Sequence, residues 1–297
     1  MRILLTGGSG FIGRNLQDYL RHSHEVLAPT RAELDVSNPS AVDQWFSEQR
    51  VDAVVHGAVR PGHRNAPDPT RQLWTNLRMF FGLMRNAHRF GRLVFMSSGA
   101  VYDIARPQHR VAEEQLGVSV PSDEHGLSKY VIAEYLDQVH RTGTADVVEL
   151  RLFGVFGKHE DYAIRFVSNA ICKALFDMPI TLRQDRTFSY LYVDDLGPIV
   201  DRFLTGRHAE AAYNVVPDRT DDLYELAERI KTRSGSDLPI VVAAAGRGLP
   251  YCAANDRLRR EVPDVTFTPV DAAVNALYEW YATNLPTIDR SALTTDR

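Results

Sequence analysis

Residues 2–13 read R-I-L-L-T-G-G-S-G-F-I-G, and this stretch decides the fold. The apolar run at residues 2–6 predicts a strand, and glycines spaced G-x-x-G-x-x-G follow it directly, before an expected helix. Glycines in this place allow a tight turn, close approach of the backbone to a pyrophosphate and close helix-to-sheet packing, while the helix N-terminus faces the anion. The stretch therefore predicts a nicotinamide dinucleotide site with contacts at Gly7, Gly10, Phe11, Ile12 and Gly13.

Outward from this stretch, short β-rich runs alternate with amphipathic helical stretches. The predicted strands lie at residues 2–6, 24–28, 53–56, 93–97 and 147–152, and the predicted helices at residues 11–21, 41–48, 76–88 and 129–141. This alternation is typical of an α/β protein with a Rossmann-type, doubly wound parallel sheet.

After about residue 155 the pattern changes. Helices are expected at residues 166–176, 223–232 and 270–282, separated by short strands at 180–182, 190–193 and 240–242. We therefore expect a dinucleotide-binding domain at residues 1–155 and a smaller, mainly substrate-binding α/β lid at residues 156–297, with an interleaved boundary. The polar tail from about residue 284 lacks periodicity and is expected to fray.

Composition excludes several classes of partner. The net charge of −4 comes from interspersed charges with no basic block, which argues against nucleic acid. Cys172 and Cys252 are far apart, so neither a disulfide framework nor a metal site is suggested, and a reducing cytoplasm fits best. No run approaches the roughly 20 apolar residues that span a bilayer, so no membrane association is expected.

The end of the second predicted strand bears on the choice of cofactor. Arg31 stands where enzymes specific for NAD often place an acidic residue, and an arginine there can pair with a 2′-phosphate, which favours NADP(H) over NAD(H). Alternatively, Arg31 is simply solvated. Asp35, followed by Val36, can accept a hydrogen bond from the adenine amino group, or it can cap a helix.

Several further motifs follow one another in order along the chain. They are T-G-G-S-G-F-I-G at 6–13, H-G-A-V at 56–59, Asn76, M-S-S-G-A-V-Y at 96–102, H-G-L-S-K at 125–129, R-L-F-G-V-F-G at 151–157 and Y-L-Y-V-D-D-L at 190–196. Together they resemble the extended short-chain dehydrogenase/reductases, the NAD-dependent epimerase/dehydratase family that acts on nucleotide sugars. Within it, residues 30–36 are most similar to the ketoreductases of the GDP-L-fucose synthase type.

The resemblance implies roles for individual residues. Ser97 would lie beside the nicotinamide ribose, Lys129 would hold the ribose hydroxyls, and Ser98 would bind the reacting sugar oxygen. The remaining cofactor contacts would be Gly57, Ala58 and Val59 on the adenosine side, with Asn76 and Leu152. Besides Ser98, the substrate contacts would be Gly99, Tyr102, Asn169 and Arg186.

The largest departure from the family pattern concerns the proton donor. The family has tyrosine in Y-x-x-x-K, whereas this chain has His125 four residues before Lys129, a spacing that places both on one helix face. Three interpretations stay open. His125 is the acid/base, Tyr102 or His159 supplies the proton instead, or the chain binds cofactor without turnover, through natural loss or an introduced change.

Other departures lie in the substrate half. Gly154 stands where the family often has a substrate-binding asparagine, and Phe188 where a diphosphate-binding arginine is common. Arg186 can compensate, or it is a solvated turn residue. Asn169 and Arg165 are expected sugar or phosphate contacts, although polar residues on helices usually face water.

Together these features favour one reaction. Gly99-Ala100 replaces the Asp-Glu pair of the sugar dehydratases, and Arg31 favours NADPH and hence net reduction. We expect NADPH-dependent reduction of a keto group, at C4, on a nucleotide-linked sugar. The alternatives are an NAD-dependent nucleotide-sugar 4-epimerase and a non-catalytic dinucleotide-binding homologue. A homodimer through the helices at 80–88 and 129–141 is expected by the same resemblance.

Overall fold

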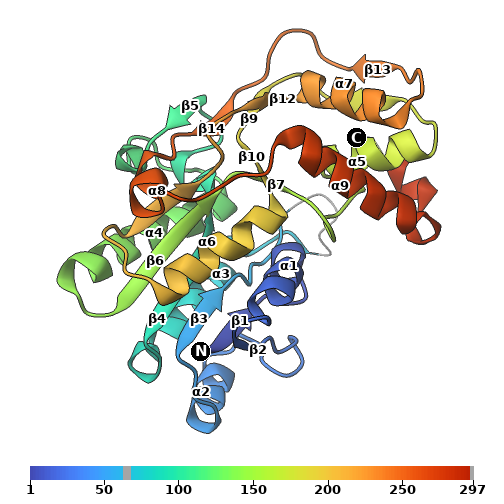
Figure 1. Ribbon diagram of the computed structural model, residues 1–297. Helices are drawn as coiled ribbons and strands as arrows, with labels where there is room; N and C mark the ends of the chain where they lie inside the picture. The colour runs from blue at the N-terminus through green and yellow to red at the C-terminus, as the bar shows by residue number, and fades with distance from the viewer. Residues whose placement is uncertain (63–67, 295–297) are drawn as a thin grey trace.

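The computed structural model describes residues 1–62 and 68–294, and its centre is a six-stranded parallel sheet (Figure 1). The strand order is β11-β6-β4-β3-β1-β2. These strands are β1 (Arg2–Thr6), β2 (Glu25–Leu27), β3 (Ala53–His56), β4 (Arg92–Ser98), β6 (Asp146–Leu152) and β11 (Ala212–Val215). The order reverses between β1 and β3, and ligands of such sheets bind at the carboxyl ends of the strands at this switch point. The predicted fold class is confirmed.

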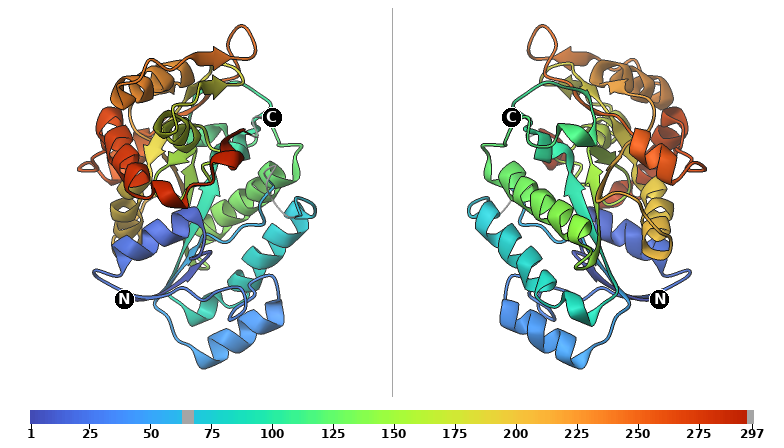
Figure 2. Two further views of the ribbon diagram at one scale, coloured as in Figure 1. Left: turned by 90° about the vertical axis from the view of Figure 1, so that its right-hand side faces the viewer. Right: turned by 90° about the vertical axis from the view of Figure 1, so that its left-hand side faces the viewer.

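Helices cover both faces of this sheet (Figure 2). One face carries α1 (Phe11–Leu20) and α6 (Leu196–Thr205), and the other carries α2 (Pro39–Glu48), α3 (Gln72–Met84) and α4 (Glu124–Thr142). The side chains of successive residues in β1 point to opposite faces of the sheet, as they do along any strand. Ile3 and Leu5 are buried against α1 and α6, whereas Leu4 is buried with the helices of the opposite face.

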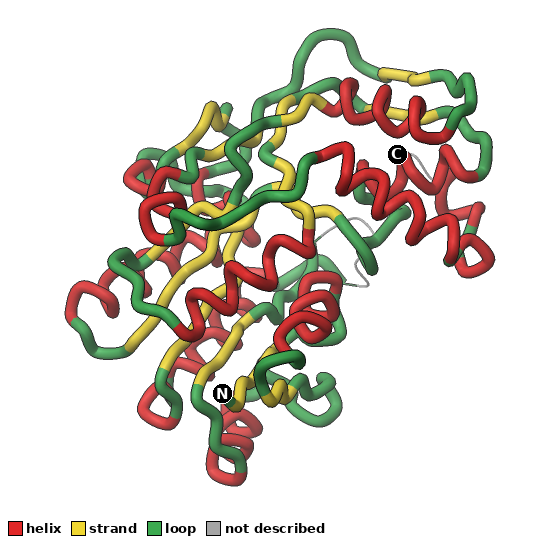
Figure 3. The backbone as a smooth tube through the Cα atoms, in the orientation of Figure 1, coloured by secondary structure: helices red, strands yellow, loops and turns green. Residues whose placement is uncertain are grey.

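A second apolar core lies beyond one end of the sheet, where α5 (Phe166–Leu175), α7 (Leu223–Ser234) and α9 (Val270–Thr283) gather (Figure 3). Small sheets join this region to the first. Their strands are β5 (Gln108–Val111), β7 (Gly154–Phe156), β8 (Ile180–Leu182), β9 (Thr187–Phe188), β10 (Tyr190–Tyr192), β12 (Asp221–Asp222), β13 (Ile240–Val242) and β14 (Tyr251–Ala253), and α8 (Asp256–Glu261) follows β14. The chain returns to the large sheet with α6 and β11, so the two regions interleave.

Most predicted elements appear within a few residues of their expected bounds. The main shift is in α4, which begins at Glu124 rather than at residue 129. Its cap is Asp123, whose Oδ1 accepts a hydrogen bond from the Gly126 N–H at 2.8 Å. A glycine and polar neighbours hide this first turn from an apolar pattern, although it carries His125. The pattern also missed α6 and β11.

The expected frayed tail is wrong over the residues that the structure describes. Two short turns, Leu285–Thr287 and Arg290–Thr294, continue the chain after α9. Leu293 is buried in the second core, and the Asp289 N–H donates to the Tyr162 hydroxyl at 3.0 Å. One apolar anchor in a polar segment gives no periodic signal. The end of this tail, residues 295–297, lies outside the described residues.

Candidate active site

The glycine loop after β1 forms a tight turn in which Gly7 and Gly13 leave no room for a side chain. Gly7 has φ = 77°, and a Cβ there would lie 2.7 Å from the Ala58 nitrogen. A Cβ at Gly13 would overlap the Gly7 carbonyl oxygen, whereas one at Gly10 would stay 3.3 Å from it. Among the described residues no side chain caps α1, so its first N–H groups are open to an anion. The loop therefore fits a dinucleotide pyrophosphate.

The loop after β3 meets this glycine loop. Thr6 Oγ1 and His56 Nδ1 are hydrogen-bonded at 2.7 Å, and the Ala58 N–H donates to Thr6 Oγ1 at 3.3 Å. The structure thus brings Gly57 and Ala58 against Gly7, at the switch point of the sheet. Val59, the next residue, is exposed.

Arg31 lies just beyond β2 with 79% of its side chain exposed, and its Nη2 is 3.5 Å from Asp35 Oδ2. Asp35 also accepts from the Ser37 N–H at 3.0 Å. It does not cap α2, because Asn38 holds that position, so that alternative is wrong. The side chain of Val36 is buried in the core, which leaves only its backbone to face a ligand.

The second half of the cofactor site lies at the end of β4. Lys129 is buried in α4, and its Nζ donates to the Met96 carbonyl at 3.1 Å. Burial lowers the pKa of Lys129 to about 8, against the opposing charge of Glu149. Ser97 Oγ is buried and lacks a hydrogen-bond partner within the described part of the chain. An unpartnered hydroxyl at Ser97 and a buried ammonium that binds the carbonyl of the preceding residue, Met96, fit a ligand that offers ribose hydroxyls.

Asn76 holds this arrangement together from inside. Its Oδ1 accepts from the Arg60 N–H at 2.8 Å, and its Nδ2 donates to Ser128 Oγ at 3.1 Å. Ser128 Oγ in turn donates to the His125 carbonyl at 2.7 Å. Asn76 thus connects the loop after β3 to the first turn of α4. Leu152 is likewise buried in the core.

Ser98 and His125 occupy the ends of β4 and the start of α4. Ser98 Oγ accepts from the Ala100 N–H at 3.2 Å, which begins the short 3-10 helix Gly99–Tyr102. Burial and, to a smaller extent, the charge of Lys129 on the same helix lower the pKa of His125 to about 4. The imidazole of His125 is therefore neutral at neutral pH.

One residue at this site gave no sequence signal. Tyr251 begins β14, and its hydroxyl lies 3.4 Å from Ser98 Oγ. Its ring packs against Phe153 at 4.8 Å and Phe188 at 5.7 Å between centroids. Because β14 pairs with β5 and β9, which are distant in sequence, no local motif reveals that Tyr251 reaches Ser98.

The model of the NAD dependent epimerase/dehydratase family matches residues 3–216, which is most of the chain and includes the glycine loop, Ser98 and Lys129. The chain belongs to this family. The family predicted from the motifs is confirmed.

Curated relatives in this epimerase/dehydratase family include reductases and epimerases. GDP-L-fucose synthase of Azorhizobium caulinodans is 32% identical over 164 residues, which span 52% of this chain and 53% of that protein. UDP-glucose 4-epimerase of Bacillus subtilis is 27% identical over 86% of each chain. GDP-6-deoxy-D-mannose reductase of Pseudomonas aeruginosa is 28% identical over 81% of this chain and 82% of the relative.

Solved structures agree on the fold. A GDP-L-fucose synthetase from Naegleria fowleri has a TM-score of 0.82 at 16% identity, over 96% of this chain and 94% of that one. UDP-glucose 4-epimerase from Thermotoga maritima has a TM-score of 0.82 at 20% identity, over 96% of this chain and 100% of that one. The Naegleria protein was also solved bound to NADP, and a Thermus thermophilus UDP-glucose 4-epimerase in complex with NAD.

Tyr102 and His159, the two alternatives to His125 as proton donor, differ in burial and contacts. The Tyr102 hydroxyl is buried, donates to Asn214 Oδ1 at 2.8 Å and accepts from Arg151 Nη1 at 2.6 Å. Burial raises the pKa of Tyr102 well above its usual range. Tyr102 is therefore part of a buried network, and these contacts argue against its expected roles as proton donor and substrate contact. His159 is exposed, and its ring packs edge-on against Trp280 at 5.3 Å between centroids.

Aromatic rings surround Gly154 and Phe188, the two positions that depart from the family pattern in the expected substrate half. The Tyr190 ring occupies the space beside Gly154, since a Cβ there would lie 2.8 Å from Tyr190 Cδ1. Tyr190 stacks on Phe188 at 5.0 Å, and the Arg186 guanidinium lies over Phe188 at 4.6 Å. Arg186 Nε is buried without a hydrogen-bond partner in the described residues. Arg186 is thus half-buried over Phe188 and is not a solvated turn residue.

Two expected substrate contacts are turned inward. Asn169 of α5 is buried, and its Nδ2 donates to the Tyr162 carbonyl at 2.9 Å. The ring of Phe153 covers Gly99 so closely that a Cβ there would overlap it. Arg165, just before α5, is exposed.

No described helix is long and apolar enough to cross a membrane, and no three potential metal-ligating side chains of the described residues gather together.

Proposed function

We propose that this protein reduces a keto group, at C4, on a nucleotide-linked sugar with NADPH. The observation that supports this most is the end of β4, where the Ser97 hydroxyl before Ser98 has no partner among the described residues and the buried Lys129 ammonium donates to the Met96 carbonyl. Family members share the dinucleotide site, and a bound reduced nicotinamide supplies a hydride to a carbonyl carbon. Ser98 would hold the carbonyl oxygen while Ser97 and Lys129 hold the ribose.

The choice of NADPH rests on Arg31. Its exposed guanidinium lies beyond β2 on the adenosine side, and it has only the long ion pair to Asp35 to give up when a 2′-phosphate arrives. Exposed ion pairs contribute about 1 kcal/mol or less, so a phosphate can compete. In Arg31→Ala, the ratio of NADPH to NADH affinity should fall at least about tenfold. An unchanged ratio would refute the phosphate pairing.

The nucleotide end of the substrate is assigned to Arg186. Its burial lowers the pKa of the guanidinium, and its unpartnered Nε can donate to a diphosphate without breaking a protein hydrogen bond. In Arg186→Met the KM for a nucleotide sugar should rise, while the dissociation constant of NADPH stays the same. An equal loss of both affinities would indicate a folding defect instead.

The main test mixes the protein with NADPH and 4-keto-6-deoxyhexoses linked to GDP, UDP or dTDP, and follows the nicotinamide absorbance. Loss of absorbance with one of them supports the proposal. Demonstrable NADPH binding without loss for any of them would favour a non-catalytic homologue. The alternative of 4-epimerisation is favoured by the relative that matches 86% of the chain, and it predicts interconversion of hydroxyl epimers without net NADPH loss.

We also propose a homodimer through α3 and α4. Their outer faces expose Trp74, Phe81 and Tyr135, and the last two pack edge-on at 5.0 Å between centroids. Phe81→Arg should give a monomer in analytical ultracentrifugation. Val118→Arg, at another exposed apolar residue, is the control and should not change the mass. A wild-type monomer at micromolar concentration would contradict this proposal.

A further inference from the structure

The sugar oxygen must receive a proton as its carbon is reduced, and the following inference rests on the proposed function. We propose that the hydroxyl of Tyr251 donates this proton to the oxygen held by Ser98. Tyr251 thereby does the work of the tyrosine that the family pattern has at residue 125. The observation is the 3.4 Å between the Tyr251 hydroxyl and Ser98 Oγ.

The geometry places the Tyr251 phenol next to the expected position of the sugar oxygen. An oxygen bound to Ser98 Oγ on the side that faces Tyr251 is within hydrogen-bond reach of the Tyr251 hydroxyl, which lies 3.4 Å from Ser98 Oγ. The hydroxyls of Ser98 and Tyr251 come from different sheets, β4 and β14, and converge from separate sides. Tyr102 cannot compete, because its hydroxyl is committed to Asn214 and Arg151.

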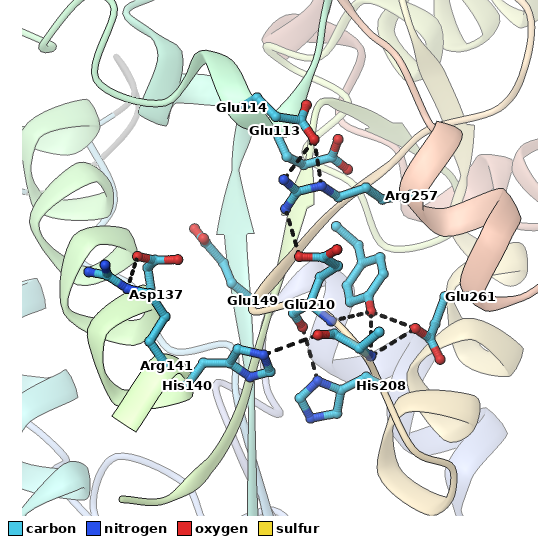
Figure 4. Close-up of polar contacts among 12 residues, drawn as sticks. Glu113, Glu114, Asp137, His140, Arg141, Glu149, His208, Glu210, Arg257 and Glu261 are labelled. Atoms are coloured by element: carbon cyan, nitrogen blue, oxygen red, sulfur yellow. Dashed lines mark hydrogen bonds and ion pairs between the residues drawn. The ribbon is translucent and has the colours of Figure 1, made fainter. Parts of the chain in front are cut away.

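The segment that carries Tyr251 is firmly held, as a proton donor requires. On one side, the Gln108 N–H donates to the Pro250 carbonyl at 3.0 Å. On the other, Arg257 of α8 donates to Glu114 Oε1 at 2.7 Å and lies 3.7 Å from Glu210 (Figure 4). These contacts tie the chain before β14 to β5, and α8 after it to the segments that follow β5 and precede β11.

The surroundings keep the phenol protonated until it is needed. Burial raises the pKa of Tyr251 to about 12, whereas the Ser98 hydrogen bond and the charges of Arg186 and Arg165 oppose the rise, and Asp123 adds to it. The phenol therefore carries its proton throughout the neutral range. The alkoxide of a reduced carbonyl is a stronger base than a phenolate, so transfer from Tyr251 is downhill.

His125 lacks a comparable proton. With its pKa lowered to about 4 by burial and by Lys129, the imidazolium that could act as an acid is absent at neutral pH. The side chain of His125 then only occupies the place of the family tyrosine, and its backbone carbonyl accepts a hydrogen bond from Ser128.

The proton balance closes without a further reagent. As the carbonyl carbon is reduced, its π electron pair moves onto the oxygen. The O–H bond of Tyr251 breaks while an O–H bond forms on the sugar, and the phenolate regains a proton from water. The reductant is the NADPH of the proposed function, and nothing else is oxidised or reduced.

The test compares wild type with Tyr251→Phe, His125→Phe and Tyr224→Phe, the last being an exposed tyrosine of α7 as matched control. Phenylalanine keeps the ring packing of Tyr251 and removes only its hydroxyl. With the keto-sugar panel, Tyr251→Phe should lower kcat about 100-fold or more at unchanged NADPH affinity, the range for loss of a general acid. His125→Phe and Tyr224→Phe should stay within a few-fold of wild type.

Two further measurements separate catalysis from structure. If Tyr251 is the acid, kcat should not fall between about pH 5 and pH 7, whereas an imidazolium acid with a pKa of about 4 would lose activity there. Independently of turnover, 3-fluorotyrosine at residue 251 gives a fluorine resonance that should shift in Ser98→Ala and on addition of the keto-sugar substrate.

The outcomes decide between the two proposals. The inference fails while the proposed function stands if wild type turns over and Tyr251→Phe keeps its kcat. It fails likewise if wild type turns over and the fluorine resonance shifts neither in Ser98→Ala nor on addition of the keto sugar. If wild type reduces none of the keto sugars, the proposed function fails and the inference falls with it.

Discussion

Alanine replacements at Gly13 and Gly10 should separate packing from ligand binding within one loop. A Cβ at Gly13 would overlap the Gly7 carbonyl oxygen and come within 2.7 Å of the Gly8 Cα. Both obstacles are backbone atoms, so α1 itself must shift. Overpacking of this kind costs about 1–3 kcal/mol. Alanine returns about 1 kcal/mol of helix propensity, which leaves a net loss of up to about 2 kcal/mol.

Gly10 differs because an added Cβ there would meet only one atom of the protein within 4 Å. Its φ of −81° and ψ of 175° suit alanine, and the nearest atom to an added Cβ is the Gly7 oxygen at 3.3 Å. The change should therefore cost less than about 1 kcal/mol of stability. The same Cβ would stand before the uncapped N-terminus of α1, where a pyrophosphate must approach, and should weaken NADPH binding at least about tenfold.

Thermal unfolding without ligand and titration of NADPH fluorescence measure the two effects. Gly13→Ala should lower the unfolding temperature by several degrees and also weaken binding, because the helix moves. Gly10→Ala should unfold like wild type and bind poorly. If Gly10→Ala binds NADPH as tightly as wild type, the assignment of this loop as the pyrophosphate cradle is refuted.

Three further changes test the fold around the site. Glu160 is buried with a pKa raised to about 8, mainly by burial, so the native state holds a proton that the unfolded chain has lost. Its unfolding free energy should fall as pH rises from about 4.5 to about 8, and Glu160→Gln should flatten that slope in urea titrations. Glu149→Gln leaves Arg151 with an uncompensated buried charge and should cost about 3–5 kcal/mol in the same assay. Gly154→Asn should destabilise by about 1–3 kcal/mol because Tyr190 fills that space, and a tolerated asparagine would contradict the packing.

The sequence was most informative where a local pattern and a physical requirement coincide. The run at residues 2–6 and the three glycines predict strand, turn and helix, and at Gly7 and Gly13 neighbouring backbone atoms in the structure leave no room for a Cβ. The i, i+4 placement of His125 and Lys129 holds for the same reason, since it depends only on helix geometry.

The remaining parts of the site depend on contacts between distant segments. Tyr251 meets Ser98 only through the pairing of β14 with β5 and β9. Tyr102 points into the core, where its hydroxyl forms hydrogen bonds with Asn214 and Arg151. A strand pairing between segments far apart leaves no trace in local periodicity. The inward turn of Asn169 was hidden likewise, since a helical pattern does not say which polar residue is buried.

The central claim, net hydride transfer to a keto sugar, is tested most directly with NADPH deuterated at its hydride position. After reaction with a 4-keto nucleotide sugar, mass spectrometry and proton NMR locate the label. Our account predicts one deuterium on the former carbonyl carbon for each NADPH consumed. Product that carries no deuterium, or a sugar that is epimerised while NADPH stays constant, would contradict it.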